Sequence, residues 1–234
     1  MNSTKSIIYQ FRFGDECVKE IPLTFDAETF DLQTEPLIDA PAWTALSFHQ
    51  CPNCPLLQQE HACCPVAKSI QAYVMGFEGL KSFETADIRV ITAEREYFKR
   101  DALQIGLSSM MGLLMATSGC PVLDKLRPMA YMHLPFANHR ETMYRTVSMY
   151  LLSQYFQQKH GQRPDWQFRK LIKIYTEVSN VNQYFSKRLR NIAQSDANAN
   201  SLVRLDCLAS TITLSIVSDW WEEIEHIFHP YFSP

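Results

Sequence analysis

Apolar residues recur at the spacing of amphipathic helices from Leu103 almost to the end of the chain. Residues 103–117 are apolar nearly all round, which predicts a buried helix that stops at Ser118-Gly119. Later helices are expected over residues 139–159, from an N-cap at Asp165 to about residue 194, and over residues 199–228 as one helix or a broken pair.

The first hundred residues carry a different pattern, in which apolar and polar residues alternate as in strands. Residues 7–13 and 17–25 flank the turn-like Gly14-Asp15-Glu16 and predict a β-hairpin. Pro22 lacks a backbone donor, so we expect the second arm to be an edge strand or to be bulged. Residues 42–49 and 88–98 are interpreted as two more strands, with an amphipathic helix over residues 66–83 between them.

These patterns predict an α+β fold in which a small antiparallel sheet packs on a mainly helical bundle. Residues 1–100 should form the sheet-containing half with a Cys-Pro loop, and residues 101–234 the helical half of one compact unit. Hydrophobic residues make up 46% of the chain and charged residues 20%, which excludes disordered, collagen-like and coiled-coil proteins.

Four of the seven cysteines lie between Cys51 and Cys64, where random placement would give roughly 0.4. Proline follows Cys51, Cys54, Cys64 and the more distant Cys120, and it does not follow the other three cysteines. Proline fixes φ and ends regular structure, so it holds a loop open around a ligand. Ferredoxin-type ligation of a cluster ends in the same Cys-Pro step.

Cys51, Cys54, Cys64 and Cys120 are therefore the candidate metal ligands, and four thiolates suit an iron-sulfur cluster or tetrahedral zinc. Cys63, His49 or His61 could replace one of them in a zinc site. The alternatives are a redox-active dithiol at Cys51 and Cys54, a haem contact through a single thiolate, or buried cysteines that act as small apolar side chains.

The segment from Ser118-Gly-Cys-Pro to Leu134-Pro-Phe136, with the apolar helix before it, resembles an uncharacterised bacterial protein family whose members share the Gly-Cys-Pro step. The resemblance extends to the Cys-Pro cluster and to residues 196–206. It implies one unit across most of the chain, and it implies no activity and no catalytic residue.

The net charge of −3 hides an asymmetry between two segments. Residues 1–60 have nine acidic and three basic side chains (−6), whereas residues 159–204 have nine basic and three acidic ones (+6). Opposite charges, together with the apolar Trp220-Trp221, make a homodimer a candidate assembly, with no protein partner identifiable. The overall acidity disfavours a nucleic-acid partner.

Residues 1–13 lack the pattern of a signal peptide, and no uninterrupted apolar stretch approaches the ~18 residues of a membrane span. We therefore expect a cytoplasmic protein with reduced thiols and no membrane partner. The leading functional hypothesis is a metal- or iron-sulfur-binding protein with a role in sensing redox state or metal, or in regulation. The alternatives are a redox enzyme that uses the same centre and an interaction protein with a structural zinc.

Overall fold

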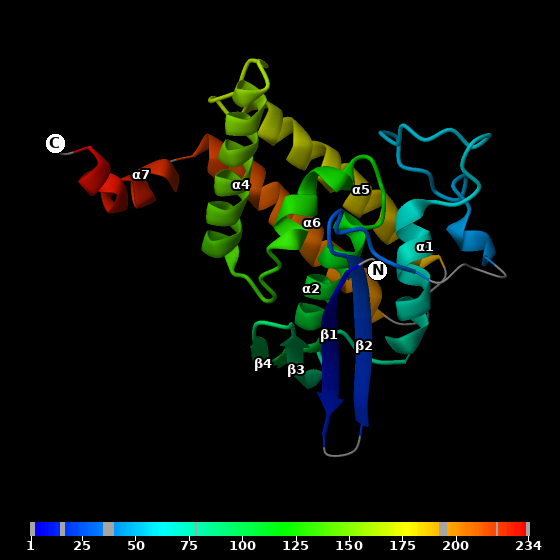
Figure 1. Cartoon of the computed structure of the whole chain (residues 1–234). Helices are drawn as coiled ribbons and strands as arrows, with labels where there is room; N and C mark the ends of the chain where they lie inside the picture. Colours follow the sequence, from blue (N-terminus) through cyan, green and yellow to red (C-terminus); the bar gives the residue numbers. More distant parts are fainter. Residues whose placement is uncertain are drawn as a thin grey trace.

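The computed structural model describes residues 3–14, 17–34, 40–77, 79–191, 196–218 and 220–232. Its sheet has four antiparallel strands in the order β2-β1-β3-β4. The strands are β1 (Thr4–Phe13), β2 (Cys17–Asp26), β3 (Thr85–Ile91) and β4 (Glu96–Ala102). The sheet lies at one end of the molecule and the long helices lie at the other (Figure 1), so the predicted α+β fold is confirmed.

The predicted hairpin is β1 and β2, whose register runs from Phe13 opposite Cys17 to Thr4 opposite Asp26. Pro22 pairs with Ile8 without interrupting the ladder, and β2 is an edge strand, as the proline predicted. Alternate residues of this hairpin are buried under the helices: Ile7, Tyr9, Phe11, Leu23 and Phe25.

The prediction of a strand over residues 42–49 was wrong. This segment forms a 3₁₀ helix, η1 (Ala42–Thr44), followed by turns. Its buried apolar residues, Trp43 and Leu46, are three positions apart, which suits a helical turn better than the two-residue period of a strand.

The single strand predicted over residues 88–98 is instead a hairpin made by β3 and β4. Thr92 makes the turn between them, because its hydroxyl accepts hydrogen bonds from the backbone N–H groups of Glu94 (3.3 Å) and Arg95 (3.1 Å).

The longer helices agree with the predicted periodicity in all but their ends, whereas no helix was predicted over residues 118–136, which contain two short helices. The first is shorter than expected, since α1 (Pro65–Val74) passes into η2 (Met75–Phe77). The cap of α5 is Phe168 in the left-handed region (φ 59°), and the expected cap, Asp165, accepts a 2.7 Å hydrogen bond from the backbone N–H of Lys170. The other helices are α2 (Leu103–Ala116), η3 (Leu123–Leu126), α3 (Arg127–Tyr131), α4 (His139–Lys159), α5 (Arg169–Arg190), α6 (Asp196–Val217), α7 (Trp220–Glu225) and η4 (His226–Tyr231).

Helix α2 joins the two layers, because one of its faces lies on the sheet and another contacts α6. Gly106 permits the close approach to the sheet: a Cβ there would lie 2.5 Å from Phe11 Cε1 and 2.9 Å from Ile88 Cδ1. Buried side chains from Ile7 to Ile216 form one hydrophobic cluster that spans both halves of the chain.

Within the described residues, one segment, Ala197–Val217 of α6, is long and apolar enough to match a membrane span. This match is weak evidence for a membrane, because core helices of water-soluble proteins have the same composition. Helix α6 also carries Arg204 and Asp206 and packs against α5 and α2. The side chain of Trp220, part of the expected dimer stripe, lies outside the described residues.

Candidate metal centre

A loop between η1 and α1 carries Cys51 and Cys54. The backbone N–H of Cys54 donates to the carbonyl oxygen of Cys51 (3.0 Å), which closes the Cys-Pro-Asn-Cys turn. The side-chain amide of Asn53 then donates to the carbonyl oxygen of Glu177 (3.0 Å) and fixes this turn to α5. The spacing of the motif therefore produces a tight turn, as predicted, and α5 holds the turn in place.

Cys64 and Cys120 share one local geometry. Each precedes a proline at the start of a helical turn, Pro65 at the beginning of α1 and Pro121 before η3. The backbone N–H groups two and three positions later donate to each cysteine sulfur: Val66 and Ala67 to Cys64, and Val122 and Leu123 to Cys120. Such donors stabilise a thiolate more than a thiol.

All four predicted ligands line one small cavity of about 20 Å³. Apolar side chains enclose it, among them Leu46, Leu56, Val122, Val181 and Phe185. Space of this size holds about one water-sized particle. Within the described residues, no three His, Cys, Asp or Glu side chains already form a metal-ligand group, so binding would require the thiols to move closer together. The ligand assignment therefore remains a prediction.

Burial dominates the acidity of these thiols. It raises the pKa of Cys51 to about 12, and the nearby thiols of Cys64, Cys120 and Cys54 raise it further. Burial also raises the pKa of Cys64 and of Cys120, although the N–H donors to each sulfur oppose that effect. Cations close to the sulfurs are therefore needed to keep several of them ionised.

One such cation, Arg188 of α5, already lines the cavity. Arg188 is only 1% exposed, and its guanidinium donates to the carbonyl oxygens of Trp43 (2.7 Å) and Ala45 (2.8 Å). Burial lowers its pKa, whereas the thiols of Cys64, Cys51 and Cys54 oppose this shift. None of the salt bridges in the described part of the chain involves Arg188. The cysteine sulfurs are thus the groups that would balance its charge.

The alternative ligands lie elsewhere, since Cys63, His49 and His61 do not line this cavity. The sulfur of Cys63 faces the hydroxyl of Thr44 (3.8 Å), and His49 Nε2 lies 3.1 Å from Asn191 Nδ2. His61 is exposed. These three side chains therefore lie outside the cavity that the four Cys-Pro cysteines line.

A family model described as "Domain of unknown function (DUF6901)" matches residues 7–229, nearly the whole chain. The chain belongs to this family. The resemblance to an uncharacterised family is therefore confirmed. Neither a curated protein nor a solved structure gave a significant match to this DUF6901 member.

Sequence analysis of this DUF6901 chain missed Arg188, which it counted as part of a basic helix surface. The helical phase contained the signal: Arg188 lies seven residues after Val181 and three after Phe185, and both are buried. An arginine on the apolar stripe of a helix is a candidate for a buried charge with a specific partner.

Proposed function

We propose that this protein binds a metal through the thiolates of Cys51, Cys54, Cys64 and Cys120 and acts in the cytoplasm as a sensor of redox state or metal, or as a regulator. The observation that carries the proposal is the cavity that brings the four cysteines together beside the buried cation Arg188. Two turns of the same form, at Cys64 and Cys120, support it because both direct N–H groups at a sulfur.

The size of the cavity favours zinc over an iron-sulfur cluster. About 20 Å³ suits a single ion, whereas a cluster would require the surrounding apolar side chains to move. Four thiolates around Zn²⁺ carry a net charge of −2, which Arg188 reduces to −1. A buried cation is therefore a fitting neighbour for such a centre.

Unequal burial of the ligands supports a sensing role. Cys64 and Cys120 are buried at the starts of helical turns, whereas Cys51 and Cys54 are half-buried on a loop. An oxidant that reaches the outer pair would convert both thiolates into a disulfide, taking two electrons from them and releasing the metal. The loop over residues 45–62 would then lose one of its attachments to the bundle.

The alternatives to a sensor are a redox enzyme that uses the same centre and an interaction protein with a structural zinc.

Elemental analysis of protein purified without oxygen tests the proposal. We expect about one zinc per chain, a lower content in Cys54→Ser, and an unchanged content in Cys207→Ser, because Cys207 is exposed on α6. Absorption near 400 nm would identify an iron-sulfur cluster instead of zinc. Absence of any metal from the wild type, or equal metal content in the two variants, would refute the proposal.

Metal release with peroxide distinguishes the roles. Reversible release at a concentration that leaves the fold intact supports a sensor. Loss of metal only together with unfolding supports a structural zinc and refutes the sensing role.

A further inference from the structure

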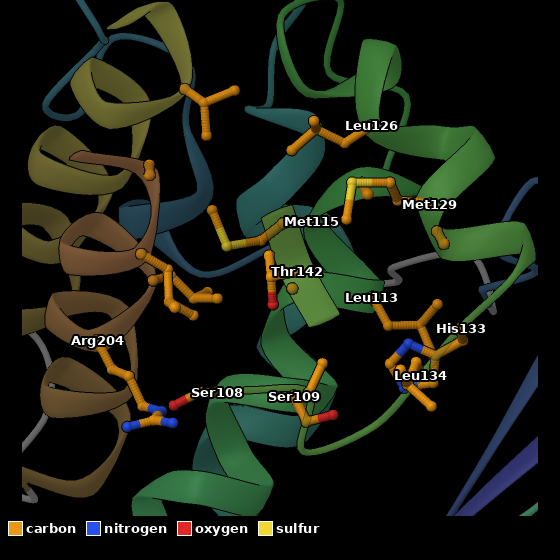
Figure 2. A pocket seen from close by; sticks show the side chains of 18 of the residues that line it. Ser108, Ser109, Leu113, Met115, Leu126, Met129, His133, Leu134, Thr142 and Arg204 are labelled. Carbon is orange, nitrogen blue, oxygen red and sulfur yellow. The ribbon is translucent and has the colours of Figure 1, made fainter. Parts of the chain in front are cut away.

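A second and larger cavity, of about 190 Å³, lies among α2, α3, α5 and α6. It shares no lining residue with the cysteine cavity. Its walls are mostly apolar, with Leu113, Met115, Leu126 and Met129 among them (Figure 2). An engineered apolar cavity of about 150 Å³ is enough to bind benzene, so this volume suffices for a small organic ligand.

The lining has a positive bias, since it contains two arginines, Arg145 and Arg204, and no Asp or Glu. Arg145 has a structural role, because its Nη2 donates to the carbonyl oxygens of Met129 (2.8 Å) and Met132 (2.7 Å). His133 adds no charge at neutral pH, since burial lowers its pKa to about 3.

Arg204 is the cation that is left for a ligand. Its side chain extends from α6 toward Ser108 of α2, and Leu126 and Met129 lie on the opposite side of the picture (Figure 2). No hydrogen bond or salt bridge of its side chain occurs within the described residues. Its charge contributes to the lowered pKa of Asp101, but that carboxylate already binds Lys99 (3.0 Å) and its neighbour's backbone N–H.

Asn182 supplies a second polar group without a partner. It is 3% exposed and lines the same cavity from α5, and within the described part of the chain its amide makes no hydrogen bond. Its amide at the wall of the cavity can therefore form a hydrogen bond with the polar head of a ligand.

We propose that this cavity binds an amphipathic monocarboxylate, whose carboxylate pairs with Arg204 and whose alkyl chain lies among Leu113, Met115 and Met129. One unpaired guanidinium balances one negative charge, and its planar fork matches a carboxylate. The apolar walls provide the affinity for the chain, and Asn182 provides a hydrogen-bond donor within the same cavity. This site is independent of the metal centre.

Calorimetric titration of the full chain with octanoate, decanoate and laurate, each as monomeric ligand, tests the proposal. We expect one site per chain and affinity that rises about fourfold for each added methylene. Arg204→Gln should weaken decanoate binding at least tenfold, while binding of the neutral 1-decanol changes less than twofold. Arg163→Gln, at an exposed loop arginine, is the matched control and should bind like the wild type.

A second variant distinguishes binding inside this cavity from binding to apolar surface elsewhere on the protein. Ala209→Leu should reduce binding of decanoate and decanol alike, because Ala209 is buried and lines the cavity. Thermal melting shows that each variant is folded, and Gly112→Leu on α2 replaces Ala209→Leu if that variant does not fold. The proposal is overturned if the wild type fails to bind decanoate, if Arg204→Gln binds it as tightly as the wild type, or if folded cavity-filling variants retain full affinity.

Discussion

Arg188 donates a hydrogen bond of 2.7 Å to the main-chain oxygen of Trp43, which lies 145 residues earlier in the chain. A second bond, of 2.8 Å, goes to the oxygen of Ala45. The guanidinium also lies over the ring of Phe48, with 5.8 Å between its Cζ and the ring centroid. One buried side chain thereby ties the segment before the Cys51–Cys54 turn to α5.

Arg188→Met should lower the free energy of unfolding by about 2 to 4 kcal/mol, because two buried carbonyl groups lose a charged donor. Urea unfolding followed by circular dichroism measures this change. Arg190→Met, two residues later at an exposed position, should change the free energy by less than about 0.5 kcal/mol. Equal stability of the two variants would show that the contacts of Arg188 contribute nothing.

Adjacent cysteines provide a stringent test of the metal ligands. Cys64→Ser should weaken zinc binding at least about tenfold, since Cys64 lines the small cavity and Cys63 does not. Cys63→Ser is the matched control and should retain the affinity of the wild type in a chelator competition. Weaker binding by Cys63→Ser than by Cys64→Ser would contradict the assignment.

His133 should make stability depend on pH. Burial lowers its pKa from 6.5 to about 3, so between these values the unfolded chain binds the proton and the folded chain does not. Stability from this group is therefore fully present above pH 6.5 and falls as the pH is lowered toward 3.

Urea unfolding at pH 7 and pH 4.5 measures this effect. The loss of unfolding free energy on acidification should be smaller in His133→Gln than in the wild type, by at least about 1 kcal/mol. The matched control is the exposed His160→Gln, which should follow the wild type. An identical loss in His133→Gln and the wild type would argue against a neutral His133.

Asn138 begins α4 with a capping box. Its side chain accepts from the backbone N–H of Glu141 (2.9 Å), and the Glu141 carboxylate accepts from the backbone N–H of Asn138 (2.8 Å). Asn138→Ala should cost about 0.5 to 2 kcal/mol of stability, measured by thermal melting, whereas Asn138→Asp should retain the cap. Similar melting of both variants would show that the cap has little effect.

The homodimer stays a prediction, and its salt dependence can be measured. If the −6 segment of one copy contacts the +6 segment of another, light scattering should show dissociation as salt is added, because screening shortens the range of the attraction. A monomer at every salt concentration would refute the homodimer.

The expectation of no nucleic-acid partner can be tested by a mobility shift with DNA or RNA at low salt, where binding would contradict it. A variant for this test should neutralise the exposed Lys187 and Arg190 and leave the buried Arg188 unchanged.

Local patterns predicted the hairpin of β1 and β2, the helices and the group of four Cys-Pro cysteines, because each depends on residue types at fixed spacing. They failed for η1, where two apolar residues three positions apart were interpreted as part of a strand. They also missed the large cavity. Its walls come from residues 105–145 and 175–212, and no local pattern shows which side chains leave space between packed helices.

Both outer strands of the sheet are poorly suited to joining another strand. Pro22 lies midway along β2 and has no backbone N–H to donate to another strand. The other edge of β2 is already paired with β1. The opposite edge strand, β4, carries charged side chains of both signs: Glu96, Lys99, Arg100 and Asp101. These are the devices by which natural sheets avoid edge-to-edge aggregation. Self-association of this chain should therefore not proceed by pairing of these two strands with strands of another copy, and the sheet should stay at four strands at any protein concentration.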